Sequence, residues 1–291
     1  MANRKNVVFV VLFGMAIAAT VLIMAVYMTT ALFADHTLTL GDAVAVVDVN
    51  GEIGYDLGKV AEIGEYRDDD GIKAVLLCVD SPGGGVAASQ ALYQEIKKTR
   101  ERKPVVVSMG SVAASGGYYV ACAADSIVAH EGTVTGSIGV LAEYLRTEEL
   151  FRKIGLDMTV IKAGRFKDVG SPYREMTEEE KAYMGGLLDK VYEQFVRAVS
   201  ESRGIPVERV RELAEGRLYT GEEAVENGLV DRIGTYDDAL AIAARMGGIP
   251  GEPRVIRRQP RRSLAERILG RYAGAVPVGR QERIALKYII P

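Results

Sequence analysis

Between residues 43 and 240, short apolar runs rich in β-branched residues alternate with longer segments of helical periodicity, and this alternation most constrains the fold. The first three runs are AVAVVDV (43–49), AVLLCVD (74–80) and PVVVSM (104–109). Strands that are apolar throughout bury both faces, which is typical of a parallel sheet covered by helices on each side. We therefore predict an α/β domain whose ligands bind at the carboxyl ends of the strands.

The same patterns predict the elements that follow. ASGGYYVACAAD (114–125) has the composition of a helix, and SIVAH (126–130) and DMTVIKA (157–163) have that of strands. Residues 177–203 form one long helical pattern, and Thr177 and Glu180 have the spacing of a capping box at its start.

The N-terminus carries an apolar run with no charged residue between Lys5 and Asp35. A transmembrane helix needs roughly 20 apolar residues, whereas the apolar region of a cleavable signal peptide has about 7–15. We predict a cytoplasmic N-terminus (1–6), a signal-anchor helix (7–34) and a folded domain (35–250) outside the cytoplasm. Arg4 and Lys5 set this orientation by the positive-inside rule.

The C-terminal segment 251–291 is basic. It has ten Lys and Arg against three Glu, a charge of +7, which leaves −10 for the rest of the chain. One interpretation is a solvated tail. The other is an interfacial or regulatory segment, because four apolar residues have near-helical spacing: Leu264, Ile268, Leu269 and Tyr272.

Neither a metal nor a nucleotide is predicted. Cys78 and Cys122 lie in apolar runs as small core residues, and no Cys/His cluster is present. Three glycine-rich segments fall at strand ends: DSPGGG (80–85), SGG (115–117) and GTVTGSIGV (132–140). None has the pattern of a phosphate-binding loop, so backbone N–H groups that hold an oxyanion are the better interpretation.

Ser115, at the strand-to-helix junction, is either a nucleophile or a small residue that permits close helix packing. A serine nucleophile needs a base. His36 follows the membrane exit and His130 ends a strand, so neither is favoured. A lysine base needs its pKa lowered from about 10.4 to roughly 7–8 by an apolar pocket. Lys167, in GRFKDVG, and Lys162, in TVIKAG, both remain candidates on sequence surroundings alone.

Four motifs in order, DSPGG, SMGSVAASGGYY, GTVTGSIGV and GRFKDVGSP, resemble the signal peptide peptidase A family of membrane-anchored serine proteases. The segment LYTGEEAVENGLVDRIG also resembles that family, so the likeness covers roughly 43–240. Single copies of each motif are similar to the one-domain form. The resemblance implies a crotonase-like (Clp-protease-like) fold with repeated β-β-α units.

The resemblance also assigns the site. Ser115 is the nucleophile, Lys167 the general base and Ser137 the residue that orients the lysine amine. Backbone N–H groups near Gly83, Gly84 and Gly116 form the oxyanion hole. We expect a peptide substrate to bind as an added strand, against walls formed by Val134, Thr135, Gly136 and Ile138.

The implied function is degradation of remnant signal peptides and other apolar peptides at the extracytoplasmic membrane face, by a homo-oligomer without cofactor or nucleic-acid partner. One alternative is the related membrane protease group encoded beside stomatin-like proteins, whose several C-terminal spans the sequence does not show. The alternatives from another class are a crotonase-fold acyl-CoA enzyme and a non-catalytic scaffold.

Overall fold

The computed structural model describes residues 13–15, 17–25, 42–258 and 287–289. The chain divides into two compact units, Met1–Gly41 and Asp42–Pro291. Residues 13–15 and 17–25 are helical, and the remainder of the predicted anchor (7–34) lies outside the described residues. Within the described ranges, no helix combines the length and apolar character needed to cross a bilayer.

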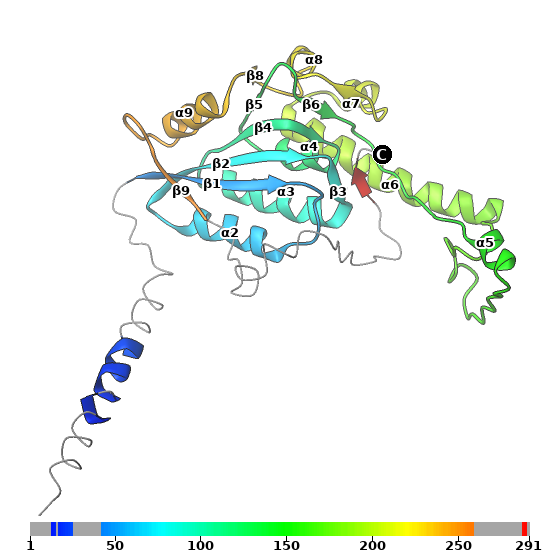
Figure 1. Ribbon diagram of the computed structural model, residues 1–291. Coiled ribbons are helices and arrows are strands. Elements are labelled where there is room, and N and C mark those ends of the chain that lie inside the picture. The colour runs from blue at the N-terminus through cyan, green and yellow to red at the C-terminus, as the bar shows by residue number, and fades with distance from the viewer. Residues whose placement is uncertain (1–12, 16, 26–41, 259–286, 290–291) are drawn as a thin grey trace, which may run out of the picture. The chain divides into compact units, whose positions relative to one another are not determined.

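The second unit is built on one mostly parallel sheet (Figure 1). Its central order is β7-β6-β4-β2-β1-β9, with β5 paired to β4 and β8 paired to β5. Every pairing in it is parallel except β6 with β7. The strands are β1 (Ala43–Asn50), β2 (Ile72–Ser81), β4 (Val105–Ala114), β5 (Ser126–Ala129), β6 (Val134–Gly136), β7 (Leu218–Tyr219), β8 (Arg232–Ile233) and β9 (Arg254–Arg257).

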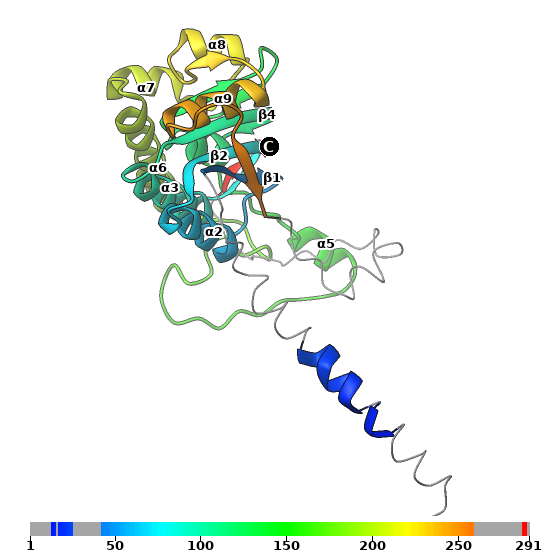
Figure 2. The same ribbon diagram turned by 90° about the vertical axis from the view of Figure 1, so that its left-hand side faces the viewer.

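Helices cover both faces of this sheet, as the continuous apolar runs predict. Alternate residues of a strand point to opposite faces, so Ala45 and Val47 join the larger core while Val44 and Val46 join the smaller one. The smaller core is closed by α9 (Tyr236–Met246), which lies across the strands from α2 and α3 (Figures 1 and 2). The larger core packs under α2 (Leu57–Asp68), α3 (Val86–Arg100), α4 (Gly116–Ala121), α6 (Glu178–Arg203) and α7 (Val207–Leu213).

A bulge in β4 sets the direction in which this strand leaves the sheet. The register with β2 runs Val79↔Met109 and then Ser81↔Ala113, so β4 has two extra residues at this point. The Asp80 carboxylate accepts a hydrogen bond from the N–H of Val112, a residue of the bulge, at 3.0 Å. The aspartate of DSPGGG therefore shapes the strand that carries Ser115.

The segment DMTVIKA (157–163), predicted as a strand, is not one. It belongs to a long excursion, residues 142–176, that contains α5 (Glu148–Lys153) and that we call the arm. The arm extends away from the sheet in both views (Figures 1 and 2). Met158, Val160 and Ile161, the large apolar residues of segment 157–163, are exposed, Ile161 by 96% of its surface. An apolar β-branched run becomes a strand only when a neighbouring strand is available.

The C-terminal segment is described at its two ends. β9 adds Arg254–Arg257 to the sheet edge beside β1, and β10 (Lys287–Ile289) pairs with β3 (Gly83–Gly85). The four apolar residues Leu264, Ile268, Leu269 and Tyr272 lie outside the described residues.

Candidate active site

Ser115 occupies a strained turn between β4 and α4. Its backbone has φ 52° and ψ −116°, a conformation that side-chain-bearing residues rarely adopt. The Ser115 N–H donates to the carbonyl of Gly136 at 2.8 Å, and its carbonyl accepts from the N–H of Tyr119. Strand and helix thus both hold the serine at the mouth of a cleft, although only 1% of its surface is exposed.

Ser137 occupies a second strained position in the same cleft. It follows β6, has φ 49°, and donates its N–H to the carbonyl of Arg217 at 2.7 Å. Among the described residues, Ser115 and Ser137 are the two non-glycine residues with positive φ. The structure therefore brings together two serines that the sequence analysis assigned to one site.

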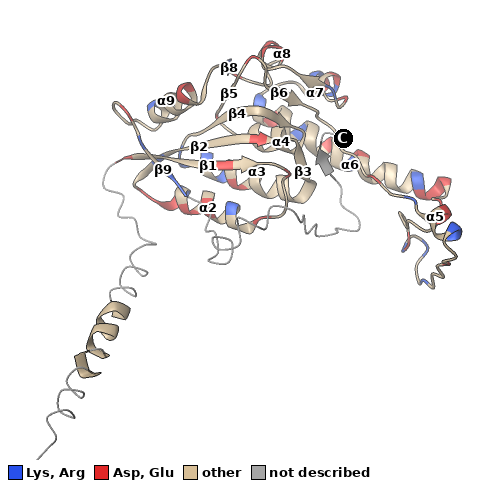
Figure 3. Ribbon diagram, viewed as in Figure 1, with Lys and Arg blue, Asp and Glu red and all other residues tan. Residues whose placement is uncertain are grey.

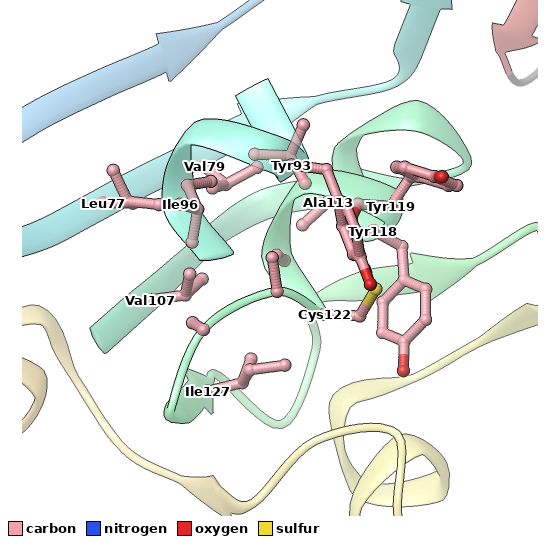
Figure 4. Close-up of a cluster of buried hydrophobic side chains, with 14 of the residues drawn as sticks. Leu77, Val79, Tyr93, Ile96, Val107, Ala113, Tyr118, Tyr119, Cys122 and Ile127 are labelled. Carbon is pink, nitrogen blue, oxygen red and sulfur yellow. The ribbon is translucent and has the colours of Figure 1, made fainter. Parts of the chain in front are cut away.

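The helix that follows Ser115 and its C-cap residue contribute Tyr118, Tyr119 and Cys122 to a buried cluster (Figure 4). The Tyr118 hydroxyl donates to the carbonyl of Leu229 at 3.0 Å. The ring of Tyr119 packs against Tyr93 and Phe195 at centroid distances of 4.9 and 4.8 Å. Burial raises the pKa of the Cys122 thiol to about 12, so this cysteine is an inert core residue, as predicted.

The DSPGGG turn packs directly on the start of α4. A Cβ at Gly117 would lie 2.7 Å from the carbonyl oxygen of Ser81, so glycine is required there. The Ser81 hydroxyl donates to the carbonyl of Gly51 at 2.6 Å and accepts from the N–H of Gly83 at 3.1 Å. This second bond corrects one expectation, because it commits the Gly83 N–H, a predicted oxyanion donor, to the turn.

The backbone of Gly84 faces the side of β3 that β10 occupies, and Gly116 begins α4. On one side of β3, the Gly83 carbonyl accepts from the Ile53 N–H at 2.8 Å, and the Gly85 N–H donates to the Ile53 carbonyl at 2.9 Å. Because backbone groups alternate along a strand, those of Gly84 face the opposite edge. Gly116 is the first residue of α4, where an N–H has no partner within the helix.

That opposite edge of β3 holds an extended peptide in the structure. β10 runs antiparallel to β3, with Ile289 opposite Gly83, Tyr288 opposite Gly84 and Lys287 opposite Gly85. This edge of β3 is therefore able to pair with an added strand.

The cleft at Ser115 has a volume of about 540 Å³. Two acidic residues at its rim, Asp189 of α6 and Glu215, are site residues that the sequence analysis missed. They come from a helix and a loop far from the glycine-rich motifs in sequence, and no local pattern marked them. The lining comprises Ser115, Ser137, Gly139, Val140, Leu141, Gly185, Leu188, Asp189, Tyr192, Ala214, Glu215 and Gly216.

The four residues predicted as substrate walls are not among the residues that line the cleft. Thr135 and Ile138 are fully buried, and the Thr135 hydroxyl donates to the carbonyl of Ala113 at 2.6 Å. Val134 and Gly136 belong to β6, which is already paired with β4 and β7. Gly139, Val140 and Leu141, which follow β6, line the cleft.

Lys167 does not line the cleft of its own chain. It is exposed and lies in the arm, so the apolar pocket suggested by its sequence neighbours is not formed around it. Lys162, the competing candidate, is also in the arm, and its amine is engaged with the Asp168 carboxylate and the Arg165 carbonyl. His130 is exposed at the end of β5. No group of metal-binding side chains occurs among the described residues.

The sequence is similar to those of known proteases. The model of peptidase family S49 matches residues 97–249, and that of the Clp protease matches 60–130. A Methanocaldococcus jannaschii protein named as a protease is 43% identical over 176 residues, covering 60% of this chain and 57% of that protein. A Synechocystis protein, also named as a protease, is 45% identical over 176 residues, 60% of this chain and 64% of that protein.

The Arabidopsis thaliana chloroplastic serine protease SPPA is 38% identical over 192 residues, covering 66% of this chain and 28% of that protein. The chain thus spans between about half and two thirds of the first two relatives, and less of the third. The S49 match covers more than half of this sequence and includes both strained serines. The chain therefore belongs to peptidase family S49, the family of the signal peptide peptidase A proteins.

Proposed function

We propose that this protein is a serine endopeptidase in which Ser115 is the nucleophile and Lys167 the general base. One observation carries the proposal: the two strained serines, Ser115 and Ser137, line one cleft at the carboxyl end of β4. A strained strand-to-helix turn is the setting in which hydrolases present a nucleophilic serine. Membership of the S49 family supports the same chemistry.

The reaction proceeds by acyl transfer. The neutral Lys167 amine takes the proton of the Ser115 hydroxyl as its oxygen attacks the peptide carbonyl. The backbone N–H groups of Gly84 and Gly116 hold the oxyanion, and Ser137 orients the amine. The lysine proton then passes to the leaving amine, and water hydrolyses the acyl-enzyme by the same route.

The exposed position of Lys167 favours a dyad assembled between two copies of the chain. The arm exposes a set of large apolar side chains that a second copy could cover: Leu145, Leu150, Ile154, Leu156, Met158, Val160 and Ile161. The positive charge of Lys167 complements Asp189 and Glu215 at the rim of the cleft. A homo-oligomer in which the arm of one copy enters the cleft of the next explains both features.

The substrate is an extended, apolar peptide. Pairing of β10 with the edge of β3 supports recognition through the backbone, which tolerates many sequences. We further propose that residues 7–34 anchor the catalytic domain at the extracytoplasmic membrane face, where remnant signal peptides are its substrates. The uncharged run between Lys5 and Asp35 supports this anchor.

Cleavage of a fluorogenic, signal-peptide-like apolar peptide by the full-length protein in detergent tests the proposal. Wild type is compared with Ser115→Ala and Lys167→Ala. We expect both variants to lose activity by about three orders of magnitude or more, because each removes a group that acts in the transition state.

Each contrary result points to a different correction. Activity retained by Lys167→Ala but lost by Ser115→Ala would move the base to Lys162 or His130. Equal activity in all three proteins would leave Ser115 as a packing residue and the chain as a scaffold.

A further inference from the structure

A cluster of four charged side chains holds the loop that carries Lys167. The Asp168 carboxylate accepts two hydrogen bonds from the Arg174 guanidinium, both at 2.8 Å, and a third from the Lys162 amine. Arg174 also donates to both carboxylate oxygens of Glu180, at 2.7 and 2.5 Å. Two positive and two negative groups therefore balance in charge.

This cluster joins the loop to the start of α6. Glu180 accepts from the N–H of Thr177 at 2.9 Å, and the Thr177 hydroxyl accepts from the N–H of Glu180 at 3.2 Å, which completes a capping box. The carboxylates are well sheltered, with 12% of the Asp168 side chain and 6% of the Glu180 side chain exposed. Positive and negative residues lie side by side along α5 and the start of α6 (Figure 3). A guanidinium that binds two carboxylates through paired hydrogen bonds restricts the geometry of a loop more than a single hydrogen bond does.

We propose that Arg174 is a positioning residue for the general base: it fixes the Lys167 loop to α6 and neutralises the carboxylate that follows Lys167. The inference rests on the proposed function, in which Lys167 is the base. Asp168 is adjacent to Lys167 in sequence, and an unpaired carboxylate there would favour the protonated amine, which cannot accept a proton. Arg174 supplies both a fixed geometry and the compensating charge.

The other charges near Lys167 do not change between the variants described below. Arg165, two residues before Lys167, is paired with Glu179 of α6. In the proposed assembly, Asp189 and Glu215 of the neighbouring cleft also face the amine. A difference between variants in the pH dependence of cleavage therefore results from the charges of the four-residue cluster.

The test is the pH–rate profile of peptide cleavage by full-length Arg174→Gln and Asp168→Asn. Arg174→Gln leaves the cluster with one excess negative charge, so the pH of half-maximal kcat/KM should rise, by roughly half a unit. Asp168→Asn leaves one excess positive charge, so that pH should fall by a similar amount. For both variants we expect kcat to drop at least about tenfold, with a smaller change in KM, because the base is misplaced.

Two further variants separate charge from geometry. Arg174→Lys keeps the positive charge, but an ammonium cannot bind two carboxylates in the bidentate manner of a guanidinium. This variant should therefore have a lower kcat, with the pH of half-maximal kcat/KM (the midpoint) unchanged from wild type. The double variant Asp168→Asn with Arg174→Gln is again balanced and should return the midpoint toward wild type. A variant that merely loses folded protein loses rate equally at every pH, and its midpoint does not move.

Arg67 provides the matched control. It also bridges two carboxylates, those of Asp68 and the sheltered Glu95, but it does so at the end of α2, which precedes β2. Arg67→Gln should leave kcat and the midpoint unchanged. If Lys167→Ala is inactive but Arg174→Gln and Asp168→Asn have the wild-type midpoint, the inference about Arg174 is wrong and the proposed function still stands. An active Lys167→Ala would instead overturn the proposed function.

Discussion

At the scale of single residues, the backbone of Ser115 is the most unusual feature of the site. A side chain at φ 52° and ψ −116° costs on the order of 1–3 kcal/mol, and the surrounding contacts must offset that cost. The hydrogen bond to Gly136 and the packing of Gly117 against Ser81 provide such contacts. Ser115 lines the cleft, although only 1% of its surface is exposed.

This strain predicts that glycine at position 115 is more stabilising than alanine, the reverse of the order in a regular helix. Glycine adopts positive φ without a steric penalty, so Ser115→Gly should unfold at a higher denaturant concentration than Ser115→Ala. We expect a difference of about 1 kcal/mol in the free energy of unfolding. Equilibrium denaturation of the two inactive variants measures it.

Ser89, within α3, is the control for that comparison. Its hydroxyl donates to the carbonyl of Gly85 at 3.1 Å, and both substitutions remove this bond equally. In a helix interior glycine is less favourable than alanine by about 1 kcal/mol, so the order should reverse. If the glycine variant were less stable than the alanine variant at both positions, the backbone of Ser115 would not be strained.

The strand-to-helix junction made Ser115 a candidate from sequence, and the family resemblance assigned both Ser115 and Ser137 to the site. The glycine-rich motifs could not reveal hydrogen-bond partners. The Gly83 N–H is taken by Ser81, and nothing in the pattern distinguishes it from the N–H of Gly84. Nor could sequence neighbours show that Lys167 is exposed, because a pocket is made by residues distant in the chain.

At the scale of elements, the strands of the sheet could be predicted and the arm could not. The runs that became β1, β2 and β4 are apolar on both faces, which only burial between two helical layers satisfies. DMTVIKA has the same composition but lies where no strand can pair with it. The capping box at Thr177 was predicted correctly because both of its bonds are local in sequence.

The start of α6 should give the protein a measurable acid sensitivity. Bonds from Arg174, and then from the Thr177 N–H, lower the pKa of Glu180 from 4.5 to about 2. The ionised form is thus favoured by folding, so its stabilisation is complete above pH 4.5 and is lost as the pH falls toward 2. Thermal midpoints of wild type and Glu180→Gln, measured across this window, should differ most at neutral pH and converge in acid.

Glu178 offers a comparison on the same helical turn. Its side chain is 90% exposed and pairs with Lys181, and exposed pairs contribute little to stability. Glu178→Gln should therefore follow the wild-type curve at every pH. A gap between wild type and Glu180→Gln that stays constant down to pH 2 would mean that the cap acts through packing and not through charge.

At the scale of the whole molecule, an active site shared between copies predicts complementation. Ser115→Ala retains a working arm, and Lys167→Ala retains a working cleft. Mixing the two inactive proteins under conditions that allow subunit exchange should restore about a quarter of wild-type activity, the share of random contacts that join an intact cleft to an intact arm.

Two controls define that experiment. Each variant alone must stay inactive at the total concentration of the mixture. The double variant, Ser115→Ala with Lys167→Ala, should restore no activity to Ser115→Ala, since neither partner then has a nucleophile. A mixture of the two single variants that stays inactive after proven exchange would place the base within the same chain as Ser115.

The position of the arm, away from the cleft of its own chain, also constrains how copies can join. Two copies that exchange arms reciprocally form a two-fold dimer, whereas in the assembly proposed above the arm of each copy enters the cleft of the next in a head-to-tail contact. Such a contact either closes into a ring or continues as an open row. An open row leaves one empty cleft at one end and one unused arm at the other, whereas a closed ring leaves neither. Turnover per chain is therefore lower in an open row than in a closed ring. In open rows it rises with each added copy, and the rise is largest for the shortest rows.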